Sequence, residues 1–516
     1  MSLADGPSPV AEELARERSL AQKTGWSAAS SICLMVARLA AQVILARLLG
    51  AAGLGSYSYL LWLSEIVAVF TRMGLTTTLI RFGAELYGKG DDNGTRLLMR
   101  WVMTRLGVLT LVGTAVTGVL ALRSEQNQGL AIVPVLLVAI FAAQQAREVN
   151  RAVLSSRQRF DQLAHINMVA AGLLLLGVTL GGALFGLAGA LGGSLLGSLV
   201  PAVFGLKWVV GSRADGVLDV DLRQRLRVYA VNTWLAAIAT NIVWARSEVF
   251  FLERFWDAKE VAMFTVSLTV ASVASRAATL LSGAFMAHFS ELVGQERHDL
   301  VQRQYATATG LMMLLVMPMS LGGAAIVPTA LPLLVGPEYV PAIPTAMLLM
   351  ASSGLAFTTI GSALIYARER SRWVVICGVL GTAIAVGAGF VVIPQSGSWG
   401  AACARTVNQL LMIALGTWYL TRRMGMRFPW ASLLKSVVAS TVCGALAWVL
   451  SSLAPGGVPG LVLGVVCGAG AYLVLLRLLG GLEPDEALQL GRLARRLPQR
   501  LADWGQGGLD WIGTTR

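Results

Sequence analysis

The feature that most constrains this chain is a succession of apolar runs, each about 20 residues long and separated by short polar loops. A run of this length spans the hydrocarbon core of a bilayer as an α-helix. We count fourteen of them in the 516 residues, at 26–49, 55–76, 101–121, 129–149, 163–184, 187–209, 228–251, 261–287, 306–330, 341–366, 372–394, 398–420, 431–453 and 457–479. The sequence therefore predicts an all-α polytopic membrane protein.

The charges are few and unevenly distributed. Only 13% of the residues are charged, whereas soluble proteins have about a quarter. With residues 1–25 in the cytoplasm, thirty of the 41 Lys and Arg fall on the inward side, three fall outside and eight lie within spans. This is the positive-inside bias. It supports the count of fourteen spans, because one missed helix would place every later loop on the opposite side of the membrane. We expect both termini in the cytoplasm, and we assign the net charge of +13 to topology rather than to nucleic-acid binding.

Other classes of protein find little support in the sequence. No cleavable signal peptide is visible, because the first 24 residues mix both charge signs and the first apolar run is a full span. All five cysteines lie in apolar spans without metal-type spacing, and the three histidines lie near predicted cytoplasmic ends. We expect no metal, no cofactor and no enzymatic activity.

The two halves of the chain look related. The segment around the first outward turn, 46–60, superposes on 253–267 around the fourth, and 85–92 resembles 291–298. When each repeat has an even number of helices, the two repeats have the same orientation in the membrane, and a substrate site is expected near their interface. We therefore predict an N-terminal lobe at 1–210, a cytoplasmic linker at 211–227, a C-terminal lobe at 228–421, two extra helices at 431–480 and a cytoplasmic amphipathic tail at 481–516.

Two further patterns concern packing. Small residues on one face allow membrane helices to approach closely. Helices five and six carry such glycines at four-residue spacing, which favours packing within the lobe, with a dimer face as the alternative: Gly182, Gly186, Gly189, Gly193 and Gly197. The tail has leucines on one face and arginines on the other, which suits a helix in the inner-leaflet interface or a partner-binding segment.

Polar residues inside three spans are the candidates for function. Ser31, Arg38 and Gln42 fall on one narrow stripe of helix 1. Glu65 and Arg72 share one face of helix 2, about 10 Å apart along its axis. Arg276 lies at the centre of helix 8. An ionisable residue within a membrane segment usually faces a bundle interior or a water-filled cavity.

The balance of charge within the spans favours an anionic ligand. Five arginines compete there for two well-buried carboxylates, Glu65 and Glu248. For Arg246 and Arg405 the sequence leaves two roles open, contact with a structural partner or contact with the cavity. Arg47 is close enough to the outer surface for a structural role. The surplus positive charge requires water or an anion, and a planar guanidinium matches phosphate oxygens.

Three segments carry a family resemblance: ILARLLGAAGLGSYSYL at 44–60, RMGLTTTLIRFGAELYGKGD at 72–91 and VGPEYVPAIPTAMLLM at 335–350. With fourteen spans, the chain resembles the polysaccharide (O-antigen-type lipid-linked oligosaccharide) flippases of the multidrug/oligosaccharidyl-lipid/polysaccharide exporter superfamily. The resemblance implies two six-helix lobes around a central cavity. It also implies alternating access that carries a polyprenyl diphosphate-linked oligosaccharide to the outer leaflet of the bacterial inner membrane.

In such flippases, cavity arginines of helices 1, 2 and 8 would hold the diphosphate, and these map onto Arg38, Arg72 and Arg276. The expected partners are the lipid-linked cargo, membrane lipids and a polysaccharide polymerase or other assembly proteins. The full set of expected substrate-binding residues is Arg38, Arg72, Arg276, Gln42, Ser31, Glu65, Arg405 and Arg246.

Three alternatives stay open. A peptidoglycan-precursor flippase has a similar fold, a similar cavity charge and fourteen helices. A cation-coupled drug exporter would have twelve spans and acidic cavity residues. A non-transport scaffold of a polysaccharide assembly complex would leave the arginines within the spans unexplained.

Overall fold

The computed structural model describes residues 9–127, 129–210, 216–244, 247–295, 297–368, 370–453 and 457–480. All regular structure in these ranges is helical, which confirms the predicted all-α class. The helices are α1 (Pro9–Arg72), α2 (Leu75–Gly88), α3 (Asp92–Arg123), α4 (Ile132–Ser156), α5 (Phe160–Val210), α6 (Val220–Trp244), α7 (Glu248–Phe255), α8 (Ala258–Gly294), α9 (His298–Met317), α10 (Gly323–Val335), α11 (Ile343–Ser353), α12 (Thr359–Ala367), α13 (Ser371–Val391), α14 (Ile393–Trp418), α15 (Trp430–Leu453) and α16 (Val458–Leu478).

The helices have the length and surface of a multi-pass membrane protein. Nine helical stretches of the described chain are long and apolar enough to cross a bilayer. Two of these stretches, Ile32–Arg72 and Phe160–Phe204, are bent at a glycine and each contains two of the predicted spans. Leu111, Leu184 and Leu453 are each more than 70% exposed. Large apolar side chains on the outside match a surface that contacts lipid.

The chain divides into two compact units, Met1–Arg246 and Ser247–Arg516. The predicted linker at 211–227 does not mark this division. The predicted seventh span, 228–251, contains the described part of α6, which runs to Trp244, and the start of α7 at Glu248, while residues 245–246 lie outside the described residues. Leu226 and Ala230 of α6 are buried in an apolar cluster with Phe82 of α2, and this packing ties α6 to the first unit.

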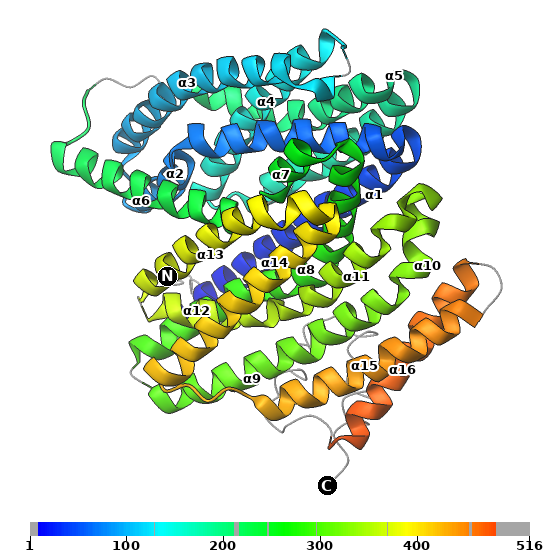
Figure 1. Ribbon diagram of the computed structural model, residues 1–516. Helices are drawn as coiled ribbons and strands as arrows, with labels where there is room; N and C mark the ends of the chain where they lie inside the picture. The colour runs from blue at the N-terminus through cyan, green and yellow to red at the C-terminus, as the bar shows by residue number, and fades with distance from the viewer. Residues whose placement is uncertain are drawn as a thin grey trace, which may run out of the picture. The chain divides into compact units, whose positions relative to one another are not determined.

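The first unit is built around long neighbouring helices. In Figure 1, α1 and α4 both lie against α5. A second layer of contacts joins α2, α3, α4 and α6 through a buried apolar cluster that includes Leu98 of α3 and Val149 of α4. These contacts fix α2, which leaves α1 at a turn where Met73 and Gly74 both have positive φ.

Glycines close the hairpin inside α5. Gly181 faces Gly189, and Gly177 faces Gly193, so closely that a methyl group on one would overlap the backbone of the other. Small residues give membrane helices this approach. The glycine pattern therefore serves packing within the unit, as the sequence predicted.

Corresponding turns recur in the two halves. Gly186 interrupts α5 with φ 56° and ψ −133°, and Gly397 interrupts α14 with φ 53° and ψ −136°. Glycine reaches this region without steric cost. The caps before α3 and α9 also agree, with φ −85° and ψ 83° at Asp91 and φ −86° and ψ 67° at Arg297. The predicted internal repeat thus has a counterpart in the backbone.

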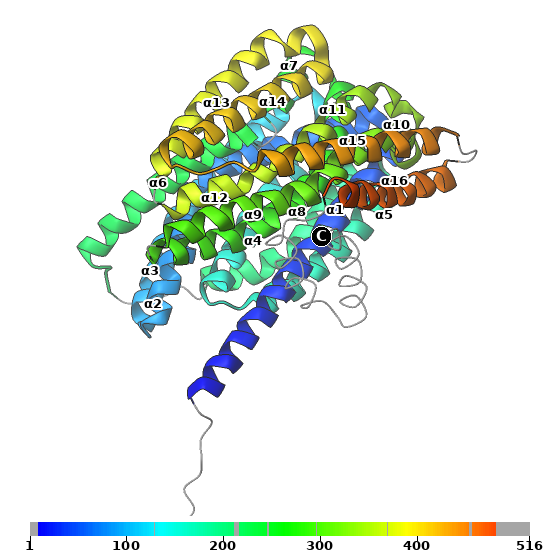
Figure 2. The same cartoon turned by 90° about the horizontal axis from the view of Figure 1, so that it is seen from below.

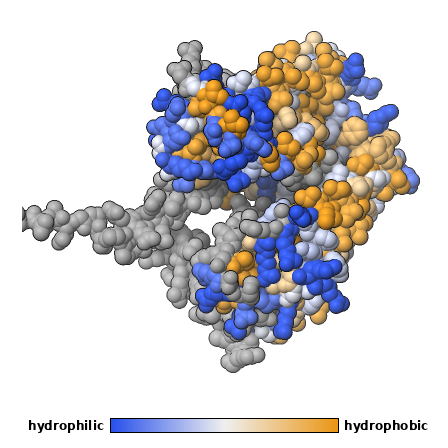
Figure 3. Space-filling view, turned by 90° about the vertical axis from the view of Figure 1, so that its left-hand side faces the viewer, coloured by the Kyte–Doolittle hydropathy of each residue, from blue (hydrophilic) through white to orange (hydrophobic). Residues whose placement is uncertain are grey.

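The second unit contains α7 to α16. Within it α8 packs against α11 and α12, and α13 packs against α14. The orange helices α15 and α16 lie side by side in both Figure 1 and Figure 2. Figure 3 shows hydrophilic side chains gathered on the face in view and hydrophobic side chains along its flank, as expected for membrane helices seen toward their ends.

Candidate functional site

The predicted site residues of the first unit lie on α1, and Arg72 among them contacts α4, a helix that the sequence did not single out. Val67 and Ala68 of α1 are buried against Phe141 of α4. This apolar contact sets the register of the two helices. One turn beyond it, both helices become polar: α1 ends in Thr71 and Arg72, and α4 continues into a run of Gln, Arg and Glu at 144–151.

Arg72 is held by a chain of hydrogen bonds. Its Nε donates to Oε1 of Gln145 at 2.8 Å, and Nε2 of Gln145 donates to Oγ1 of Thr71 at 3.0 Å. The hydroxyl of Thr71 in turn donates to the Val67 carbonyl of its own helix. Because the amide of Gln145 is neutral, it orients the guanidinium without neutralising its charge.

Glu148 is the acidic member of this region. Its Oε2 lies 2.7 Å from Nε of Arg151, and its Oε1 lies 3.9 Å from Nη2 of Arg147. Glu148 also interacts electrostatically with Arg72. One carboxylate therefore serves three guanidinium groups.

Arg38 and Glu65 complete the group. Both are exposed, and both interact electrostatically with Arg147, as does Arg72. The α1–α4 cluster, as we call Arg38, Glu65, Arg72, Arg147, Glu148 and Arg151, thus contains four arginines and two glutamates. A charge at the bilayer centre costs roughly 2.5–3.5 kcal/mol on insertion scales. A surplus of two positive charges in this cluster favours a hydrated surface that receives an anion.

Gln42 and Ser31 are the other predicted residues of helix 1. Gln42 lies on α1 and is half-buried. Ser31 lies within the same helix, but its side chain is outside the described part of the structure. Their roles stay predictions.

Arg276 lies on α8 in the second unit and its side chain is exposed. The neighbouring hydroxyls of Ser272 and Ser275 donate to carbonyls of their own helix, at 2.7 and 3.1 Å. Among the described residues, no carboxylate lies within ion-pair distance of Arg276. Its positive charge is therefore available to an anion.

Arg405 has a different environment from Arg276. Its Nη1 lies 3.0 Å from Oε1 of Glu248, and the two side chains are only 9% and 10% exposed. The pair joins α14 to α7, and the nearby Asn408 donates to the Gly381 carbonyl of α13 at 3.2 Å. This geometry favours the structural alternative for Arg405. Arg246, the other undecided arginine, lies outside the described residues.

The sequence did not identify the contribution of α4. Arg147 and Arg151 were counted among inward charges, because they lie at the end of the predicted span 129–149. The signal that could have revealed them is the run QQAREVNR at 144–151. It extends α4 by two polar turns and places Arg151 four residues after Arg147 and three after Glu148, so that both share a face with Arg151.

Comparison with known proteins resolves the family. The profile of a family described as "Polysaccharide biosynthesis protein" matches residues 44–344, more than half of the chain. The chain belongs to this family. A second profile, for the lipid II flippase MurJ, matches residues 258–467. No curated protein matches the sequence significantly.

Solved structures agree on the fold. A lipid II flippase MurJ in an inward closed conformation matches with a TM-score of 0.70 at 11% identity, covering 88% of this chain and 98% of the other. An inward-facing MATE family transporter of the MOP superfamily matches with a TM-score of 0.60 at 14% identity, covering 76% and 94%. A Vibrio cholerae MATE transporter matches with a TM-score of 0.56 at 14% identity, covering 79% and 97%.

The chain thus belongs to the polysaccharide biosynthesis family, and its fold is that of the MurJ and MATE structures. The match to a flippase covers nearly the whole of the flippase chain. The resemblance to a polysaccharide family and the fold that it implied are thereby confirmed.

Proposed function

We propose that this protein moves a polyprenyl diphosphate-linked oligosaccharide from the cytoplasmic to the outer leaflet of the bacterial inner membrane, for the synthesis of a cell-surface polysaccharide. The observation that carries the proposal is the surplus of guanidinium groups over carboxylates in the α1–α4 cluster. Guanidinium groups bind phosphate oxygens in bidentate fashion. The family profile supports a cargo of the polysaccharide pathway.

In the proposed mechanism, Arg38, Arg72 and Arg147 of the first unit and Arg276 of the second bind the diphosphate in a cytoplasm-open state. Gln145 orients Arg72, because it receives the Nε hydrogen bond at 2.8 Å. Gln42, Ser31 and Glu65 contribute to the same polar surface.

Alternating access then carries the bound diphosphate outward between the two lobes. The sugar travels in the hydrated cavity and the prenyl chain stays in lipid. Both termini lie in the cytoplasm, and the products pass to a polymerase or to other assembly proteins.

A second candidate function is the flipping of a peptidoglycan precursor. It is favoured by the profile match over 258–467 and by the structural match to a lipid II flippase. Both cargoes carry a polyprenyl diphosphate, so the same arginines would serve either one.

Complementation separates the two functions. The full chain is expressed in one strain that lacks its polysaccharide flippase and in another whose peptidoglycan-precursor flippase is depleted. We expect restored surface polysaccharide in the first strain and no rescue of growth in the second. Rescue of the second strain alone would establish the peptidoglycan alternative, and rescue of neither would contradict both.

A further inference from the structure

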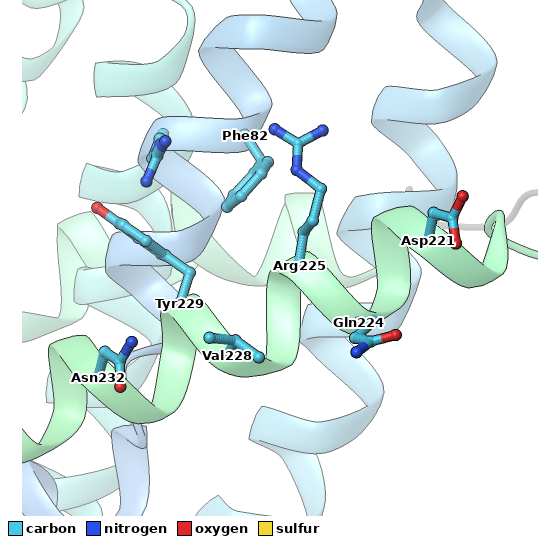
Figure 4. A pocket seen from close by; sticks show the side chains of 8 residues that line it. Phe82, Asp221, Gln224, Arg225, Val228, Tyr229 and Asn232 are labelled. Atoms are coloured by element: carbon cyan, nitrogen blue, oxygen red, sulfur yellow. The ribbon is translucent and has the colours of Figure 1, made fainter.

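A pocket on the first unit lies apart from the α1–α4 cluster. It has a volume of about 540 Å³ and is formed by α2 and α6, with Arg81, Phe82, Gln224, Arg225, Tyr229 and Asn232 among its lining residues. Figure 4 shows Arg225 and Tyr229 extending from α6 toward Phe82 of α2. None of these residues belongs to the proposed cargo site.

Aromatic rings hold the two guanidinium groups of the pocket. The Cζ of Arg81 lies 4.5 Å from the ring centre of Tyr229, and the Cζ of Arg225 lies 5.5 Å from that of Phe82. The two rings meet edge to face at 5.5 Å. An aromatic contact occupies the flat face of a guanidinium and leaves its N–H edges free to bind oxygen. The amides of Gln224 and Asn232 add further donors.

The charges around the pocket do not cancel. Glu85 lies 2.8 Å from Nζ of Lys89 and 3.7 Å from Nη2 of Arg225. The hydrogen bond from Lys89, with the charges of Lys89, Arg225 and Arg81, lowers the pKa of the Glu85 carboxyl, which is ionised at neutral pH. Among the described residues, no carboxylate pairs with Arg81. Arg81, Arg225 and Lys89 are three cations, whereas Glu85 and Asp221, which lines the pocket, are two carboxylates, so one positive charge remains.

The surroundings of the pocket are apolar on one side. Val228, which lines the pocket, is followed on α6 by Val231 and Leu235, and the three are 55%, 43% and 54% exposed. At 100° per residue they share one face of the helix. The positive-inside bias assigns α2 and the start of α6 to the cytoplasmic side. A cationic pocket thus opens at that surface beside a strip that hydrocarbon can cover.

We propose that this pocket binds the phosphate headgroup of an anionic phospholipid of the cytoplasmic leaflet, with its acyl chain along Val228, Val231 and Leu235. The phosphate oxygens accept from Arg81 and Arg225. The lipid joins α2 to α6, so it acts as a second lipid site distinct from the cargo site.

The test uses the full-length protein in nanodiscs of phosphatidylcholine with a minor fraction of photoactivatable phosphatidylglycerol. We expect cross-links on peptides of α2 and α6, and Arg81→Gln should reduce their yield roughly fivefold, since one basic residue at an anionic membrane surface has about that effect. Arg96→Gln on α3 is the matched control, because Arg96 is exposed on the same predicted side but does not line the pocket. Its yield should equal that of the wild type.

Arg225→Gln provides a second variant, because Arg225, unlike Arg81, also lies 3.7 Å from Oε2 of Glu85. Unchanged cross-linking in both variants would overturn the proposal. So would equal labelling by a phosphatidylcholine analogue. The assignment to a phospholipid would be overturned if inorganic phosphate or equimolar polyprenyl phosphate displaced the photoactivatable lipid and unlabelled phosphatidylglycerol did not.

Discussion

At the scale of single residues, the arginines within the spans separate into two kinds. Arg72 is oriented by a neutral amide and keeps its charge, and Arg276 has no carboxylate partner among the described residues. Arg405 instead forms a compact pair with Glu248. This difference could not be derived from the sequence, because the two partners are separated by 157 positions and only the packing of α7 on α14 brings them together.

Arg147 provides a test of the α1–α4 cluster. We expect Arg147→Gln to lower transport about tenfold, since a charge-assisted hydrogen bond contributes roughly 1.5–3 kcal/mol. Surface polysaccharide per membrane-inserted molecule is the measurement. Arg159→Gln, at an exposed arginine just beyond α4, should leave transport unchanged. Equal activity in both variants would remove Arg147 from the site.

The pair of Arg405 and Glu248 should behave as a structural unit. We expect Arg405→Gln and Glu248→Gln each to lower the free energy of unfolding by roughly 1.5–3 kcal/mol, because each leaves a partner charge with few contacts in a poorly hydrated position. The double variant should recover much of this loss. Thermal melting of the purified protein measures both effects. Loss of transport in Arg405→Gln with unchanged melting would instead place Arg405 in the substrate site.

At the scale of helices and turns, the sequence predicted most of what the structure contains. The lengths of the apolar runs predicted bends near Gly50 and Gly186, where the backbone has positive φ. Residues 245–248, Ala-Arg-Ser-Glu, are a polar interruption inside the predicted span 228–251, and hydropathy averaged over the whole run did not reveal it. The role of α4 was missed for a related reason, since its polar end resembles a loop.

The hairpin of α5 gives a test at this scale. We expect Gly193→Ala to destabilise the protein by about 1–3 kcal/mol, because the added methyl meets the backbone of Gly177 and Val178 and the helices cannot separate without losing contacts. Gly192→Ala is the control, since nothing lies within 4 Å of its Cβ position. Melting temperatures in one detergent compare the two. Equal melting would contradict the close approach.

At the scale of the whole molecule, topology follows from the distribution of charge. In a background without the five cysteines, we expect Lys259→Cys to react with a membrane-impermeant maleimide from outside intact inner-membrane spheroplasts. Arg96→Cys should react only after the membrane is permeabilised. Both residues are exposed, so access rather than burial decides the result. The opposite pattern would reverse the predicted orientation.

The family is established by a profile over residues 44–344 and the fold by a match over 88% of the chain, whereas the cargo is a proposal that rests on charge. A transporter whose site carries surplus arginine is matched to an anion, and a transporter of cationic drugs would need acidic residues instead. The division into a first unit with the α1–α4 cluster and a second unit with Arg276 gives each half a positive group.

The most direct measurement is translocation in proteoliposomes that contain purified protein and a fluorescent polyprenyl diphosphate-linked oligosaccharide, with outward delivery detected by a membrane-impermeant quencher. We expect protein-dependent translocation that Arg276→Ala abolishes and Arg276→Lys partly restores, because charge at this position binds the diphosphate. Translocation by Arg276→Ala at the wild-type rate, or no translocation by the wild type, would contradict the proposed function.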